Sequence, residues 1–291
     1  MEFRGLMGGF YRISEWIMRL SVTNILWVVC SLPFFYLLLV VFLNPEMVEN
    51  PDLFKQGLFL IGVVSPFTLV PATAAVFTVA RKWVTGDVDV PLLKTFFRGY
   101  KENYLQSMLG GIAYLILTGI LYVNYQFYGN QEGTLSLLSY LFITLFVILV
   151  ASFFNYLSIM VHFHMKFWQI LKNSLLITIG RPIASIIIII SNVAIVMISF
   201  KYNFLIPFFM GSVIAIVTFW HFHRGFIKLQ EQREKLEQME AEREQEEQEE
   251  REREDTERPE EEPADSRDES SMDDSRSDRS EQTEPENNNK R

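Results

Sequence analysis

The chain has little of what a catalytic or metal-binding protein needs. Its 291 residues include a single cysteine, Cys30, so neither a disulfide within the chain nor a paired-cysteine zinc motif is possible. A Walker loop, a nucleophile elbow, a His-Glu-x-x-His pair and nucleic-acid-reading motifs are all missing. We therefore expect a protein that is not an enzyme, carries no cofactor and binds no nucleic acid.

Charged residues are missing from six long apolar stretches. A helix needs about 20 apolar residues to cross the hydrocarbon of a bilayer, where unpaired backbone groups find no water. The six stretches without Asp, Glu, Lys or Arg are 20–43, 57–80, 105–126, 137–160, 182–200 and 204–222. They predict an all-α, polytopic bundle of six transmembrane helices within residues 20–226. The first stretch is too long for the core of a signal peptide, so we interpret it as a retained span.

The two signs of charge are separated along the chain. Residues 230–291 hold 26 acidic and 11 basic residues, a net charge of −15, whereas the whole chain carries −9, which leaves about +6 for residues 1–229. With the N-terminus inside, the inner segments hold 13 Lys and Arg and the outer loops hold only Lys55 and Lys201. Because positive loops stay in the cytoplasm, both termini are expected there.

The inner segments are predicted to include basic amphipathic helices. Three of these segments carry apolar side chains at helical spacing, with Arg and Lys on the other side of the helix; they are residues 1–19, 91–104 and 163–176. Such helices either lie among anionic lipid headgroups or form a docking surface for a cytoplasmic partner. Acid–base pairs four residues apart predict a charged cytoplasmic helix over 227–258. Residues 259–291 have the composition of a disordered acidic tail.

Polar residues inside the spans offer only weak candidate sites. The amides Asn24, Asn124, Asn155 and Asn192 are more typical of hydrogen bonds between helices than of substrate binding. Prolines such as Pro33, Pro66 and Pro71 predict kinks in the helices. Kinked helices line the binding sites of many transporters, but kinks also occur where they only improve helix packing.

All four histidines lie in two His-Phe-His triplets, at 162–164 and 221–223. Residues two apart on a helix point about 200° from each other, so each triplet can aim only one imidazole at a shared centre. Since no carboxylate or thiolate completes a ligand set, rings at the membrane interface explain the triplets better than a metal site does.

Three segments resemble the YesL family of bacterial multi-pass membrane proteins, whose biochemical function is uncharacterised. The first is GGFYRISEWIMRLSVTNILWVVCSLPFF (residues 8–35), the second is PATAAVFTVARKWVTGDVDVPLLKTFFRGYKENYLQS (residues 71–107), and the third is FWQILKNSLLITIGRP (residues 167–182). The resemblance covers roughly residues 5–225, and the acidic tail departs from it. From the matching positions and the interrupted helices we take as candidate functional residues Glu15, Asn24, Trp27, Pro33, Pro71, Thr73, Arg81, Lys82, Lys101, Asn103 and Asn173.

The resemblance implies a role beside carbohydrate uptake and degradation. It suggests an accessory or regulatory protein of the bacterial cell membrane, with subunits of an ABC-type sugar importer or a membrane sensor kinase as partners. Two alternatives remain open: a small permease or channel for a sugar or other solute, and a metal- or pH-responsive sensor that uses the histidines.

Overall fold

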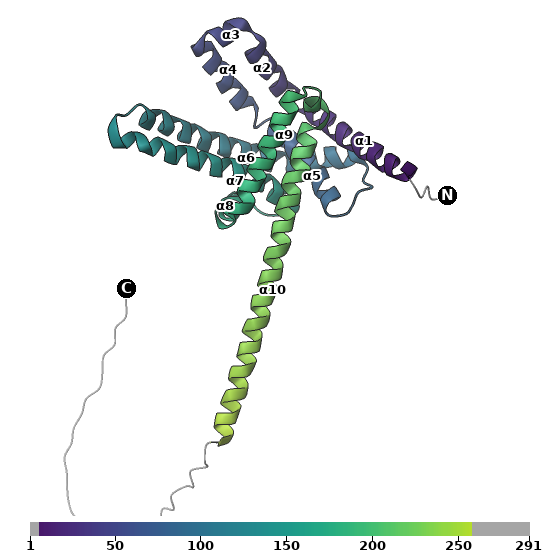
Figure 1. Ribbon diagram of the computed structural model, residues 1–291, viewed down its shortest axis with the longest axis vertical. Coiled ribbons are helices and arrows are strands. Elements are labelled where there is room, and N and C mark those ends of the chain that lie inside the picture. Colours follow the sequence, from purple (N-terminus) through teal and green to yellow (C-terminus); the bar gives the residue numbers. More distant parts are fainter. Residues whose placement is uncertain (1–5, 258–291) are drawn as a thin grey trace, which may run out of the picture. The chain divides into compact units, whose positions relative to one another are not determined.

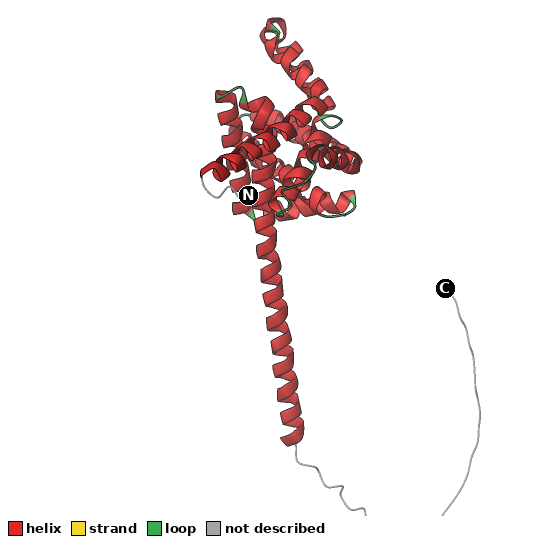
Figure 2. Cartoon of the chain, turned by 90° about the vertical axis from the view of Figure 1, so that its right-hand side faces the viewer, coloured by secondary structure: helices red, strands yellow, loops and turns green. Residues whose placement is uncertain are grey.

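The computed structural model describes residues 6–257 and is built from helices joined by short loops, with no strand in this part (Figures 1 and 2). The chain divides into two compact units, one up to Glu234 and one from Lys235 onward. The expected tail at 259–291 and the first residues of the N-terminal helix lie outside the described residues.

The first apolar stretch is divided into two helices. A single residue, Ser31, separates α1 (Leu6–Cys30) from α2 (Leu32–Leu43), and Pro33 occupies the first turn of α2. A proline is tolerated there because the first N–H groups of a helix have no partner within it. α3 (Pro45–Glu49) and α4 (Pro51–Val64) follow, and the side chains of Asn44 and Asn50 cap them. In Figure 1, α2 and α4 lie side by side, joined by α3.

The second apolar stretch forms a bent pair of helices, whereas the third lies in one continuous helix. α4 and α5 (Leu69–Val84) meet at 48° across a break that contains Pro66. Pro71, in contrast, lies in the first turn of α5, where it disturbs no helical hydrogen bond. α6 (Leu92–Gly129) is continuous and is followed by a 3₁₀ helix, η1 (Gly133–Leu137), and by α7 (Leu138–His162). α6 and α7 pack against each other along their length (Figure 1).

The last third contains α8 (Phe167–Gly180) and α9 (Pro182–Lys201). After a turn, one stretch of π-helix, η2 (Ile206–Met210), leads into α10 (Gly211–Glu257). Among the described residues, five helices are long and apolar enough to cross a membrane, and the bent pair α4–α5, counted as one span, makes six. The chain is thus an all-α membrane protein.

Two of the expected surface helices are not separate elements. Residues 6–19 are the first part of α1, and residues 92–104 begin α6, because no Pro separates either segment from the apolar stretch that follows and the helix continues through Gly8, Gly9 and Gly99. Part of the apolar side of the second segment also packs inside the protein, where Phe96 is fully buried, while Leu93 and Phe97 are exposed. The third segment is a separate helix, α8.

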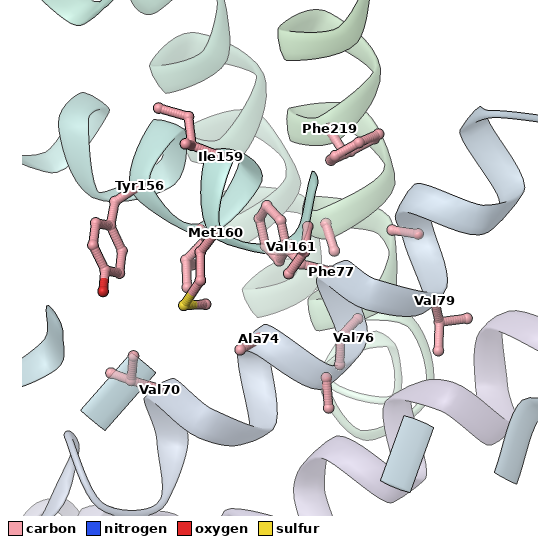
Figure 3. Packing of buried hydrophobic residues seen from close by; sticks show 14 of the residues in the cluster. Val70, Ala74, Val76, Phe77, Val79, Tyr156, Ile159, Met160, Val161 and Phe219 are labelled. Atoms are coloured by element: carbon pink, nitrogen blue, oxygen red, sulfur yellow. The ribbon is translucent and has the colours of Figure 1, made fainter. Parts of the chain in front are cut away.

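α5 lies at the centre of the core. It contacts α1, α6 and α7, and its residues Ala72, Ala74, Ala75 and Ala80 have no exposed surface. Small side chains let helix backbones approach closely, which is the main source of packing energy in lipid. Figure 3 shows Ala74 and Phe77 of α5 facing Met160 and Val161 of α7, with Phe219 of α10 nearby.

Candidate functional site

Two helix breaks and the π-helical segment η2 meet around Trp27 of α1. The α1–α2 break follows Trp27 by one turn, the α4–α5 break precedes Thr73 by about one turn, and η2 contacts α1. The Trp27 ring is 7% exposed, and its Nε1 donates a hydrogen bond of 3.0 Å to Thr73 Oγ1. A Cβ added at Gly211 would lie 2.9 Å from this ring, so glycine is needed where α10 begins. Trp27 therefore connects α1, α5 and α10.

Asn24, one turn before Trp27, completes the broken backbone at η2. Its Nδ2 donates to the Ile206 carbonyl at 2.9 Å, and its Oδ1 accepts from the backbone N–H groups of Gly211 at 2.7 Å and Ser212 at 3.1 Å. A π-turn and Pro207 disturb the normal helical pairing there, and the fully buried amide restores it. The sequence singled out Asn24 but predicted an unbroken span from residue 204; Pro207 was the available signal for the interruption.

Two hydroxyl groups beside these residues are buried without hydrogen-bond partners in the described structure. They are Thr23 Oγ1, next to Asn24, and Ser31 Oγ, at the α1–α2 break. Together with Asn24, Trp27 and Thr73 they form a polar centre inside an apolar helix bundle, which we call the Trp27 centre.

A second polar group ties α1 to the loop before α6. Arg19 is 8% exposed and contacts Glu15, the Val88 carbonyl and Asp89, whose Oδ1 lies 2.7 Å from the Arg19 Nη2. Glu15 therefore contributes to this link by contacting Arg19. In the sequence, Arg19 is one of the positive inner residues, and its spacing of four from Glu15 is the signal for this pair.

The remaining candidate residues do not converge on one site. Asn103 of α6 donates to Thr78 of α5 at 3.2 Å, close to Gly99, where an added Cβ would lie 2.7 Å from Thr78. Lys82 pairs with Asp87 at 3.0 Å, and Asn173 Nδ2 lies 3.5 Å from Met165 Sδ. Arg81 is half-buried and Lys101 is exposed. Asn103 therefore locks a helix crossing, while Lys101 remains available at the surface.

One imidazole from each His-Phe-His triplet meets the other. The rings of His162 and His223 have centroids 5.8 Å apart, and Phe219 and Phe226 lie against His162. The Nδ1 atoms of both histidines are buried without a partner. Among the described residues no group of three or more His, Cys, Asp or Glu side chains could hold a metal ion.

The other polar groups inside the spans mostly join helices. Asn155 of α7 donates to Thr178 of α8 at 2.9 Å, and Asn192 of α9 donates to Thr218 of α10 at the same distance. The Tyr114 hydroxyl lies 2.7 Å from Ser152 and 3.0 Å from Ser174, which links α6, α7 and α8. Asn124 instead donates to Ile120 of its own helix. These groups stabilise the bundle and leave few polar atoms free for a ligand.

Comparisons with a family model and with known proteins point to the same family. Residues 20–125, which include the Trp27 centre, match a family described as "Protein of unknown function, DUF624". The uncharacterized protein YteU of Bacillus subtilis (strain 168) is 30% identical over 215 residues, which is 74% of this chain and 84% of YteU. The uncharacterized protein YesL of the same organism is 25% identical over 237 residues, 81% of this chain and 98% of YesL.

A third relative, the uncharacterized protein YesV of the same organism, is 27% identical over 175 residues, 58% of this chain and 82% of YesV. No solved structure matches the chain. The family match, the extent of the alignments and the all-α membrane architecture show that the chain belongs to the YesL-like family of membrane proteins, the DUF624 family.

Proposed function

We propose that the chain is a non-catalytic accessory or regulatory component of the bacterial cell membrane, with both termini in the cytoplasm, that acts with a carbohydrate uptake system. Its partner is a subunit of an ABC-type sugar importer or a membrane sensor kinase. The sugar-related role rests on the resemblance described above. The mode of action rests on the surface at the start of α6.

The start of α6 has part of its apolar side buried, while Leu93, Phe97 and its basic side are exposed. Phe96 is buried in the core, and Gly99 packs on Thr78. Lys94 and Lys101 are exposed and have no ion pair in the described structure, while Arg98 pairs with Glu102 at 2.8 Å. A fixed helix with an open row of positive charge favours docking of an acidic protein surface, because complementary charge steers association.

Reversing these charges is expected to weaken partner recovery. After purification from mild detergent, the Lys94→Glu/Lys101→Glu variant should retain an importer subunit or sensor kinase roughly fivefold less than the native chain, since exposed charge pairs contribute about 0.2–1 kcal/mol each and reversal adds repulsion. The control is Lys55→Glu in α4, an exposed lysine expected on the outer side. Recovery of the native chain alone, or an equal loss with Lys55→Glu, would contradict the proposal.

The convergence of interrupted helices favours one other candidate function, a small permease or channel for a sugar or other solute. Interrupted membrane helices form the binding sites of many transporters because they free backbone groups inside the membrane. In the described structure, however, Asn24 pairs the backbone groups at η2, and the cavity beside η2 is lined by apolar residues such as Ile195, Leu205 and Val213. The accessory function is therefore our first choice.

A transport assay separates the two functions. Proteoliposomes that hold only this chain are expected to take up labelled oligosaccharide no faster than empty vesicles. Uptake above that level would establish the permease instead, provided that it falls in the Trp27→Ala variant and persists in Trp168→Ala, which alters an exposed tryptophan of α8.

A further inference from the structure

A small cavity lies where α7, α8, α9 and α10 meet. It measures about 30 Å³, and its lining is mostly apolar, with the polar residues Asn155, Arg181, Ser185 and His221 beside residues such as Ile188 and Phe222. All of these residues belong to the first compact unit. The volume accommodates about two water molecules, so the cavity can receive the oxygens of one small polar group but not a sugar ring.

Arg181 is positioned at this cavity by a glycine. It joins α8 to α9, and its guanidinium lies against α10 at Gly225, where an added Cβ would be 2.5 Å from Nη1 and 3.2 Å from Cζ. Any larger residue at position 225 would displace the guanidinium. Because the buried Gly225 has no side chain, it leaves room on α10 for the Arg181 guanidinium.

The donors of Arg181 are unused. In the described part of the chain, Arg181 donates no hydrogen bond and no carboxylate lies within ion-pair distance, although the residue is half-buried. A guanidinium carries five N–H donors in a rigid fork, and partial burial without an anion is unfavourable. Nearby, Asn155 already donates to Thr178 and Ser185 donates to the Thr178 carbonyl, whereas His221 makes no hydrogen bond in the described structure.

We propose that Arg181, supported by His221, binds a phosphate group at this cavity, most favourably that of an anionic phospholipid headgroup. The guanidinium fork matches two phosphate oxygens. Arg181 directly precedes the apolar helix α9, which places the cavity at the level where headgroups lie. Basic pockets between membrane helices bind anionic headgroups in this way. The small cavity admits the free oxygens of the phosphate and leaves the rest of the lipid outside.

The test measures binding of defined probes by the purified full chain in a neutral detergent. The probes are dihexanoyl phosphatidylglycerol, dihexanoyl phosphatidylcholine and inorganic phosphate. Phosphatidylglycerol is expected to bind saturably, and both Arg181→Gln and Gly225→Ala are expected to raise its Kd at least tenfold, about 1.4 kcal/mol. Gly225→Ala keeps the positive charge but moves the guanidinium, while Arg181→Gln removes the charge and leaves the backbone unchanged. A loss of binding in both variants therefore assigns the effect to the guanidinium and its position.

The matched control is Lys172→Gln, which removes one exposed positive charge from α8 outside the cavity lining and should leave Kd within twofold. Competition by inorganic phosphate that depends on Arg181 would identify a soluble phosphate compound as the ligand, and its failure to compete would identify the lipid. The proposal is overturned if neither phosphatidylglycerol nor inorganic phosphate binds saturably, if phosphatidylcholine binds as tightly as phosphatidylglycerol, or if Lys172→Gln weakens binding as much as Arg181→Gln.

Discussion

Replacing Asn24 with leucine is expected to lower the free energy of unfolding by about 2–4 kcal/mol. The substitution keeps the branched shape and the number of side-chain heavy atoms but removes three hydrogen bonds, to the Ile206 carbonyl and to the N–H groups of Gly211 and Ser212. Buried backbone groups left without partners cost about 1–3 kcal/mol each in proteins, and hydrogen bonds in membrane bundles about 0.6–1.7 kcal/mol. Reversible unfolding in mixed detergent micelles measures the change.

The control for this experiment is Asn124→Leu. Asn124 also lies within a span, but its amide donates only to Ile120 in the same helix. Its replacement should change the free energy of unfolding by less than about 0.5 kcal/mol. Equal effects of the two substitutions would show that Asn24 does not hold η2, and the Trp27 centre would lose its main structural support.

Replacing Gly110 with alanine is expected to destabilise the chain by about 2–4 kcal/mol. A Cβ at this position would lie 2.5 Å from Cζ of Tyr156, a ring with no exposed surface. Moving the ring away would break the 2.6 Å hydrogen bond from its hydroxyl to the Gln106 carbonyl. Overpacking typically costs about 1–3 kcal/mol and the lost hydrogen bond about 1 kcal/mol.

Gly119→Ala in the same helix provides a comparison of opposite sign. Nothing lies within 4 Å of a Cβ added there, so alanine should stabilise the helix by about 0.5–1 kcal/mol. Thermal unfolding midpoints in one detergent measure both variants. Adding Tyr156→Leu to Gly110→Ala should cost less than the sum of the single changes, because the clash is removed. Strict additivity would mean that Gly110 and Tyr156 do not constrain each other.

The sequence alone was sufficient for the class of protein and the approximate extent of its helices. Apolar stretches such as 105–126 and 182–200 lie within α6 and α9. This succeeds because each spanning helix must satisfy its own backbone in lipid, which makes the signal local. Helix ends were less predictable, since α1 and α6 begin well before their apolar stretches and the last stretch begins as the π-helix η2.

The candidate residues were identified more readily than their contacts. Pattern and resemblance pointed to Asn24, Trp27 and Thr73, but not to the hydrogen bond between Trp27 and Thr73. For the triplets, helix geometry limited each to one imidazole at a shared centre, and only the structure selected His162 and His223. In the sequence, Arg181 is only one of the positive inner residues, and no pattern places Gly225 or a cavity beside it.

The sequence by itself determined that this is an all-α membrane protein with an acidic C-terminal segment, because hydropathy and charge act segment by segment. Only the tertiary structure decided that α5 lies at the centre of the bundle, that Asn24 of α1 completes the backbone at η2, and that Arg181 reaches across to Gly225. These contacts join residues far apart in the chain. They depend on the shapes of side chains at helix crossings, which no local pattern encodes.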